Sequence, residues 1–150
     1  GEFVLEVHSP WHPAPKGQGL TWSIDVRDRR QWKPIALSHL PLATIYYCAS
    51  RPKGPGTPAE RHRDRVVGLQ TVCDVFKGVP VIYCSSRHAS RQSPYGMTQR
   101  VCERIVTAAG GRFVRFPALY SSTYRPWLRW VKWIYPAWSV EEAVNALLEA

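Results

Sequence analysis

A five-residue pattern occurs twice in this chain, thirty-six positions apart. The sequence reads YCASR over residues 47–51 and YCSSR over residues 83–87, and each copy closes a short apolar run. That interval is the length of one strand and one helix with their connections, so the copies predict successive strands of an α/β sheet. In open α/β sheets, ligands bind where strands end and helices begin. The Ser-Arg ends of the two copies are therefore the predicted functional edge.

The sequence around this repeat alternates strand and helix patterns. Apolar runs at 42–48, 79–84 and 113–116 have strand composition. Two amphipathic segments separate them, one beginning at a capping box from Thr57 to Glu60 and the other at Ser93, which precedes a proline. The expected apolar stripes are Val66, Leu69, Cys73 and Phe76 in the first segment, and Met97, Val101, Ile105 and Ala108 in the second.

These patterns predict one α/β domain over residues 1–150. Crossovers of this length join parallel neighbouring strands. We therefore expect a three-layer, Rossmann-like fold, with a mixed sheet whose core is a parallel βαβαβ unit at 41–117. Strands at 3–7 and 20–26, joined by a proline-rich segment, form the entry segment at 1–40 and flank the sheet.

The last segment, 118–150, is expected to hold two helices. The first, at 125–135, is rich in tryptophan and basic residues, and a capping box at Ser139 and Glu142 begins the second. The tryptophans favour either core packing or a surface that stacks on unpaired bases or contacts a protein partner through 125–138. The expected apolar face is Trp127, Trp130, Val131 and Ile134, opposite Arg125, Arg129 and Lys132.

The charge of the chain points to an anionic partner. Twenty Lys and Arg residues against eleven Asp and Glu give a formal net charge of +9, which is typical of proteins that bind nucleic acid, phosphorylated ligands or an anionic membrane surface. No apolar run approaches the roughly 20 residues of a spanning helix, and no signal pattern opens the sequence. A cytoplasmic protein without a transmembrane segment is expected.

Two loops have the composition of a phosphate site. An arginine and hydroxyl groups before a helix N-terminus complete an anion-binding arrangement, because the first backbone amides of the helix have no partner. A glycine-rich phosphate fingerprint is missing from both loops, which argues against a dinucleotide or Walker-type site. The candidate phosphate ligands are Ser50, Arg51 and Lys53 in the first loop, Ser85, Ser86, Arg87, Arg91 and Ser93 in the second, and Arg129 and Lys132 near the C-terminus.

The second loop resembles two known families. The stretch from Ser85 to Arg87, followed by Ser93-Pro94-Tyr95-Gly96 and a helix, is similar to nucleotide-binding, DNA-processing Rossmann-like proteins of the DprA family. The strand that ends at Ser85 and Ser86 also resembles the nucleophile-bearing strand of serine recombinases. Each resemblance covers only residues 80–117, and no catalytic role follows from either.

Catalytic and metal sites have little support in the sequence. The four cysteines, Cys48, Cys73, Cys84 and Cys102, have no metal-binding spacing and are expected to be buried free thiols. Asp25 and Asp28 lack the further acidic and basic residues of a nuclease core. Ser86, Arg87 and His88 are the only catalytic candidates, so the sequence leaves open whether the protein is an enzyme, and it indicates no metal or cofactor.

The function that the sequence favours is nucleic-acid binding. A basic α/β protein with arginine-rich loops at its strand ends would act in DNA transactions of a plasmid or phage type, through phosphate contacts. The alternative is a nucleotide- or phosphodiester-processing enzyme, resembling a nuclease or an NTPase, with its site in loop 84–96.

Overall fold

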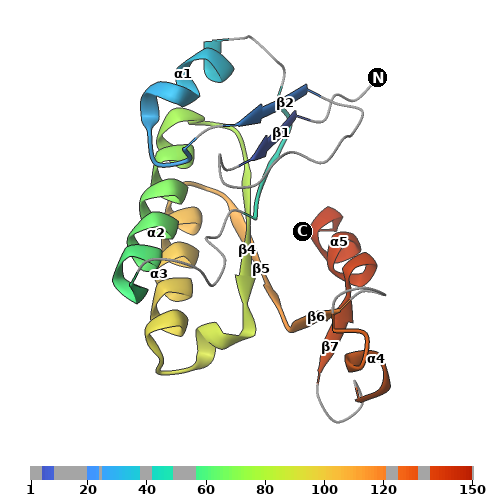
Figure 1. Cartoon of the computed structure of the whole chain (residues 1–150). Coiled ribbons are helices and arrows are strands. Elements are labelled where there is room, and N and C mark those ends of the chain that lie inside the picture. The colour runs from blue at the N-terminus through green and yellow to red at the C-terminus, as the bar shows by residue number, and fades with distance from the viewer. Residues whose placement is uncertain are drawn as a thin grey trace. The chain divides into compact units, whose positions relative to one another are not determined.

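Parallel strand pairs and helices make up the chain, which divides into two units (Figure 1). The computed structural model describes residues 5–8, 20–23, 25–37, 42–48, 57–120, 125–131 and 136–149. The first unit comprises Gly1–Leu42 and Ala49–Gly78, and the second comprises Ala43–Cys48 and Val79–Ala150. The predicted α/β, Rossmann-like fold class is confirmed, and every strand pair among the described residues is parallel.

The first unit contains two strands and two helices. Strand β1 (Leu5–His8) pairs in parallel with β2 (Leu20–Ser23). Helix α1 (Arg29–Leu37) contacts helix α2 (Pro58–Val75). Trp32 of α1 is buried and meets the ring of Phe76 edge-on, with 5.5 Å between the centroids. Helix α1 was not predicted from the sequence, because charged residues surround its two buried side chains and Pro34 lies inside it.

The predicted start of α2 is confirmed in detail. The Thr57 hydroxyl accepts a hydrogen bond from the backbone amide of Glu60 at 3.2 Å, and the Glu60 carboxylate accepts from the Thr57 amide at 2.5 Å. Leu69, Val72 and Cys73 are buried along one side of the helix, as the apolar stripe predicts. A capping box satisfies two amides that would otherwise lack partners.

The second unit is built on a three-stranded parallel sheet. Its order is β3 (Ile45–Tyr47), β4 (Val81–Ser86) and β5 (Arg112–Phe116), so the predicted pairing of the repeated motifs is confirmed. A short helix, η1 (Arg87–Ser90), follows β4 and leads to helix α3 (Pro94–Ala108), which contacts both β4 and β5. The buried residues of this unit include Val81 and Tyr83 of β4 and Cys102 and Val106 of α3.

The buried face of α3 differs from the predicted stripe. Met97 is 54% exposed and Ala108 is exposed, whereas the buried residues of the helix are Gly96, Thr98, Gln99, Cys102, Glu103 and Val106. The expected face is therefore rotated away from the observed one. The reason is that three of the buried side chains, Thr98, Gln99 and Glu103, are polar, and a hydrophobic periodicity cannot register them.

The C-terminal part of this unit forms a further parallel pair. Strand β6 (Ala118–Tyr120) pairs with β7 (Ala137–Ser139), and neither was predicted. Helix α4 (Leu128–Val131) occupies part of the helix predicted at 125–135, whose residues 132–135 lie outside the described residues. Helix α5 (Val140–Leu148) begins at the predicted capping box, where the Ser139 hydroxyl accepts from the Glu142 amide at 3.0 Å.

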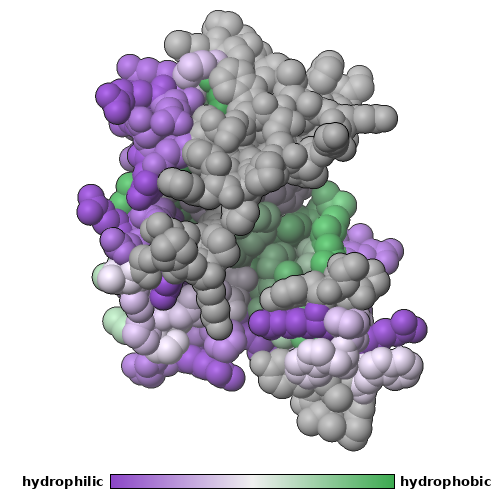
Figure 2. All heavy atoms as spheres, viewed as in Figure 1, coloured by the Kyte–Doolittle hydropathy of each residue, from purple (hydrophilic) through white to green (hydrophobic). Residues whose placement is uncertain are grey.

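The surface of the described residues is unevenly polar. Figure 2 shows hydrophilic side chains over α1 and apolar surface over α5. The apolar residues exposed on α5 are Val140, Val144 and Leu148, which are spaced four positions apart. Among the described residues, no helix is long and apolar enough to cross a membrane.

Candidate functional site

The hydroxyl group of Ser85 is directed into the interior of the second unit. Ser85 is 4% exposed and donates a hydrogen bond to Glu103 Oε1 at 2.6 Å. Arg115 of β5 donates to both oxygens of the same carboxylate, at 2.8 and 2.7 Å. Ser85 thus belongs to a buried polar network, and its predicted phosphate contact would require the loss of that bond.

The Glu103 carboxylate is held in its charged form. Burial would raise its pKa, but hydrogen bonds from Arg115 and Ser85, together with the charges of Arg115 and Arg100, bring the pKa below its ordinary value. Tyr83 adds a second buried bond beside this network, because its hydroxyl donates to Gln99 Oε1 at 2.5 Å. The network therefore ties β4 and β5 to the buried face of α3.

The loop after β4 is ordered by its own hydroxyl groups. Ser86 accepts a bond from the backbone amide of His88 at 3.3 Å, and Ser93 accepts from the amide of Gly96 at 3.1 Å. These are the amides that an anion at either helix start would contact. Both serines predicted as phosphate ligands therefore act as helix caps.

The basic side chains of this loop have different roles. Arg87 donates to the carbonyl of Pro136 at 3.4 Å, and Arg91 is exposed. Arg100, which the sequence analysis did not select, donates to the carbonyls of Ala89 at 2.5 Å and Arg91 at 2.9 Å. An arginine of α3 therefore holds the turn in place.

His88 and Tyr95 face each other at the carboxyl end of β4. Their ring centroids are 5.9 Å apart in an edge-on arrangement, and Tyr95 is 45% exposed. Burial, followed by the charges of Arg91 and Arg87, lowers the pKa of His88 from its ordinary value. The imidazole is accordingly neutral at pH 7 and able to accept a proton.

The remaining candidates divide into two groups. Ser50, Arg51, Lys53 and Lys132 lie outside the described residues. Arg129 is exposed, with its guanidinium 5.5 Å from the ring centroid of Trp130. Trp127 and Trp130 are 59% and 73% exposed, so the expectation of core packing is wrong for both. Leu128 of the same segment is buried, at 1% exposure.

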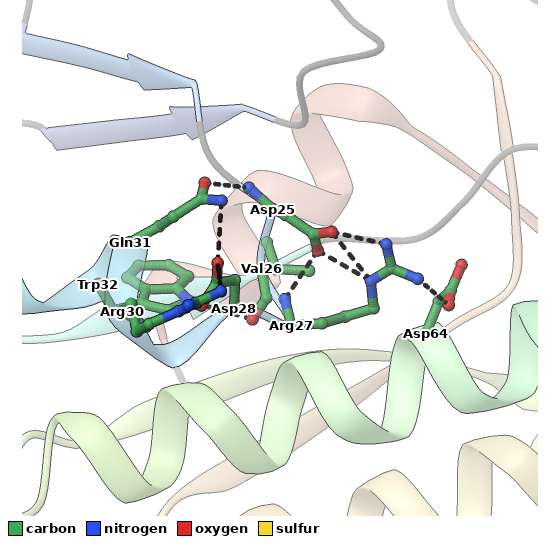
Figure 3. A network of polar contacts seen from close by, with 8 residues as sticks. All are labelled: Asp25, Val26, Arg27, Asp28, Arg30, Gln31, Trp32 and Asp64. Carbon is green, nitrogen blue, oxygen red and sulfur yellow. Dashed lines mark hydrogen bonds and ion pairs between the residues drawn. The ribbon is translucent and has the colours of Figure 1, made fainter.

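A second polar cluster lies after β2 in the first unit (Figure 3). The Asp25 carboxylate accepts bonds from the Arg27 backbone amide at 3.0 Å and from the Arg27 guanidinium at 2.6 and 2.8 Å. The other guanidinium nitrogen donates to Asp64 of α2 at 2.8 Å. Hydrogen bonds from the Arg27 side chain are the main cause of the lowered pKa of Asp25. Asp25 is therefore ionised at neutral pH.

The turn that carries Asp25 is fixed on both sides. The Asp25 amide donates to the side-chain oxygen of Gln31 at 2.9 Å, and the Trp32 indole donates to the carbonyl of Val26 at 3.0 Å (Figure 3). A cleft of about 390 Å³ adjoins this cluster, lined by Arg27, Glu60, Arg63, Asp64 and Val67. Among the described residues, no group of three or more His, Cys, Asp or Glu side chains is placed to hold a metal ion.

Solved structures provide the only informative comparison. No family model and no curated protein matches the sequence. The enzyme WbmG from Bordetella bronchiseptica, in complex with NAD, matches with a TM-score of 0.74 and 13% identity over 97% of this chain and 60% of its own. L-threonine dehydrogenase from Phytophthora infestans matches with a TM-score of 0.69 and 18% identity, over 87% of this chain and 58% of its own.

A third solved structure matches with similarly low sequence identity. A short-chain dehydrogenase from Burkholderia cenocepacia, in complex with NADP, gives a TM-score of 0.62 and 13% identity, over 87% of this chain and 64% of its own. The chain thus spans about three fifths of the length of these three solved structures. At these identities the matches establish the fold.

The functional predictions from the sequence are corrected by these matches. The predicted DNA-binding protein, its nuclease-like alternative and the nucleic-acid partner are wrong, because these structural neighbours are enzymes, of which two are dehydrogenases and two are in complex with NAD or NADP. A net positive charge indicates that the partner is anionic but does not identify it, and a dinucleotide is also an anion. Asp25, which the sequence analysis weighed only as part of a nuclease core, lies two positions after the end of the second of two parallel strands.

Proposed function

We propose that this chain is a nicotinamide-dinucleotide-binding protein of the oxidoreductase type. The observation that carries the proposal is the similarity in fold, over 97% of the chain, to an enzyme in complex with NAD. Folds built from parallel strands with helical connections bind their ligands beyond the carboxyl ends of the strands. Asp25 follows the carboxyl end of β2 and Ser86 ends β4, so each unit offers polar groups at such an edge.

Asp25 and Arg27 suit the adenosine ribose of a dinucleotide. In Rossmann folds an acidic residue about 20 positions after the first turn accepts a hydrogen bond from the ribose 2′-hydroxyl of NAD, and a nearby arginine accommodates the 2′-phosphate of NADP. The side chains of Asp25 and Arg27 are 32% and 43% exposed, so a ligand can reach both. With its carboxylate ionised, Asp25 favours NAD over the phosphorylated cofactor.

The pyrophosphate end of the cofactor is assigned to no residue. The fingerprint G-x-G-x-x-G occurs nowhere in the sequence, although Gly17 and Gly19 precede β2. Residues 9–19, which connect the two paired strands of the first unit, lie outside the described residues. The fit of the dinucleotide therefore rests on its ribose end.

The second unit supplies groups that can move a proton. Reduction of a carbonyl by a nicotinamide requires a proton donor for the oxygen, and phenol and imidazole groups serve this purpose in enzymes. Tyr95 and neutral His88 lie together at the carboxyl end of β4, and Ser86 caps the short helix η1 that carries His88. We propose Tyr95 as the proton donor to the carbonyl oxygen, after which the phenol regains its proton from solvent. In the reverse, oxidising direction neutral His88 is the neighbouring group that can accept the proton. This replaces the sequence-based set of Ser86, Arg87 and His88.

A pair of matched variants tests the proposal. Asp25→Asn removes the negative charge that faces the ribose, and Asp28→Asn removes the same charge from the same turn, where Asp28 binds Arg30 instead. NADH and NADPH are titrated into each protein and binding is followed by nicotinamide fluorescence. We expect Asp25→Asn to weaken NADH binding about tenfold and to raise the relative affinity for NADPH, because a bond to a charged acceptor is lost.

Three outcomes decide between the parts of this proposal. If wild-type protein binds neither nucleotide at millimolar concentration, dinucleotide binding is rejected. If both nucleotides bind and the two variants behave alike, the ribose assignment to Asp25 is rejected. Tyr95→Phe is expected to retain NADH binding and to lose the ability to reduce a panel of small ketones and aldehydes. Equal turnover with wild type would remove Tyr95 from the mechanism.

The free cysteines also favour the cytoplasmic location expected from the sequence, which remains part of this proposal.

A further inference from the structure

The repeated sequence motif places two cysteines opposite each other. Tyr47 of β3 pairs with Tyr83 of β4. Cys48 follows Tyr47 in the chain, and Cys84 follows Tyr83. Their sulfur atoms are 2.8 Å apart, in a hydrogen bond for which either thiol can be the donor. Both residues belong to the second unit. The two copies of the motif thus meet at their cysteines.

The backbone geometry at this position suits a covalent bond. Neighbouring strands lie about 4.7–4.9 Å apart, inside the range of about 4.4–6.8 Å between α-carbons that disulfides span. The present sulfur separation exceeds the S–S bond length by about 0.8 Å. Formation of the bond therefore requires rotation of two side chains and no change in strand pairing.

The two thiols differ in their surroundings, and both differ from the other cysteines. Cys48 is exposed, which corrects the expectation that it is buried, and Cys84 is half-buried. Cys73 and Cys102 are buried elsewhere. The hydrogen bond from Cys84 lowers the pKa of Cys48, whereas the hydrogen bond with Cys48, followed by burial and the charge of Cys48, raises the pKa of Cys84. Cys48 is therefore the thiol that ionises first and can be reached from solvent.

We propose that Cys48 and Cys84 form a reversible disulfide when the protein meets a low-molecular-weight disulfide such as oxidised glutathione. The Cys48 thiolate attacks one sulfur of the oxidant, which releases one thiol and leaves a mixed disulfide on Cys48. The Cys84 thiol then loses its proton to solvent and attacks the Cys48 sulfur, which releases the second thiol. Two protein thiols are oxidised and one disulfide reagent is reduced. The product links β3 to β4 and does not depend on the proposed cofactor.

The test follows the thiols of the full chain under native conditions. The protein is incubated with oxidised glutathione, quenched in acid, unfolded, alkylated with a maleimide and digested with trypsin. Lysine and arginine residues separate the four cysteines, so each lies in a peptide of its own. We expect two alkylated cysteines, Cys73 and Cys102, and one cross-linked peptide pair that joins residues 31–53 to residues 78–87. Dithiothreitol should return all four thiols.

Two single variants assign the order of the steps. Cys84→Ser is expected to accumulate glutathione on Cys48, and Cys48→Ser is expected to react at least tenfold more slowly at Cys84. Far-ultraviolet circular dichroism of each variant establishes that it is folded before oxidation. If wild-type protein keeps four alkylatable thiols, holds glutathione stably on Cys48, or forms a different pair, the proposal is overturned. The proposal is also overturned if Cys84 in the Cys48→Ser variant reacts with oxidised glutathione as fast as Cys48 does in the Cys84→Ser variant.

Discussion

Removal of the charge on Glu103 should destabilise the second unit far more than the same change on the surface. Glu103 is 5% exposed and accepts bonds from Ser85 and from two nitrogens of Arg115. In Glu103→Gln an amide N–H group takes the place of one oxygen and faces a donor of Arg115. The carboxamide also gives up the ion pair across α3 and β5.

The magnitude follows from the surroundings of the two partners. Loss of one partner of a fully buried ion pair costs about 3–5 kcal/mol. Arg115 has a side chain that is 43% exposed, so water can solvate it after the change, and the cost falls to about 2–3 kcal/mol. For a chain of this size, each kcal/mol corresponds to a change of roughly 2–4 °C in Tm. We therefore expect Tm to fall by about 4–12 °C.

Thermal unfolding of Glu103→Gln beside Glu141→Gln measures this effect. Glu141 is exposed in the first turn of α5, so the second variant changes the net charge equally and should shift stability by less than about 0.5 kcal/mol. The sign of the pH dependence follows from the lowered pKa of Glu103: its contribution is present above about pH 4.5 and is lost as pH falls through the folded-state pKa. Equal Tm values in the two variants, or an unchanged acid limb in Glu103→Gln, would refute the reasoning.

Three further predictions concern local elements. Gly96→Ala should lower the free energy of unfolding by roughly 1–3 kcal/mol, because the added Cβ meets the carbonyl oxygens of His88 and Arg91; an unchanged urea midpoint would contradict this. Thr57→Ala should cost about 1 kcal/mol through loss of the cap of α2, and Thr57→Ser, which keeps the hydroxyl, should recover most of it in the same assay. Since the pKa of His88 is lowered, stability should decrease as pH falls through about 6.5, and His88→Gln should flatten that slope in urea titrations at pH 5 to 8.

Local signals in the sequence predicted the parts of the fold that depend on local interactions. The capping boxes at Thr57 and Ser139 formed as expected, because each satisfies backbone amides within four residues. The parallel pairing of β3 with β4 and of β4 with β5 also followed from the order of apolar runs and helices. These features depend on residue type and spacing alone.

Features that depend on distant partners escaped the sequence analysis. The buried side of α3 carries Glu103, and its charge is compensated by Arg115 twelve positions away. Because carboxylates are mostly exposed in proteins, the sequence predicts Glu103 on the solvent side of α3, and the predicted buried face differs from the observed one. The short pair of β6 and β7 was missed for a similar reason, since strands of three residues have no measurable periodicity.

The contacts of the arginines explain why positive charge misdirected the functional prediction. Arg27 binds Asp25 and Asp64, Arg115 binds Glu103, and Arg100 binds two carbonyls of the turn after β4. A guanidinium group presents five donors in a fixed plane, which suits the carboxylates and carbonyls of a fold as well as it suits phosphates. The net charge includes these structural arginines as well as any arginine that contacts a ligand. The partner class therefore has to be inferred from charged groups that a ligand can reach, such as Arg27 and Asp25, whose side chains are 43% and 32% exposed.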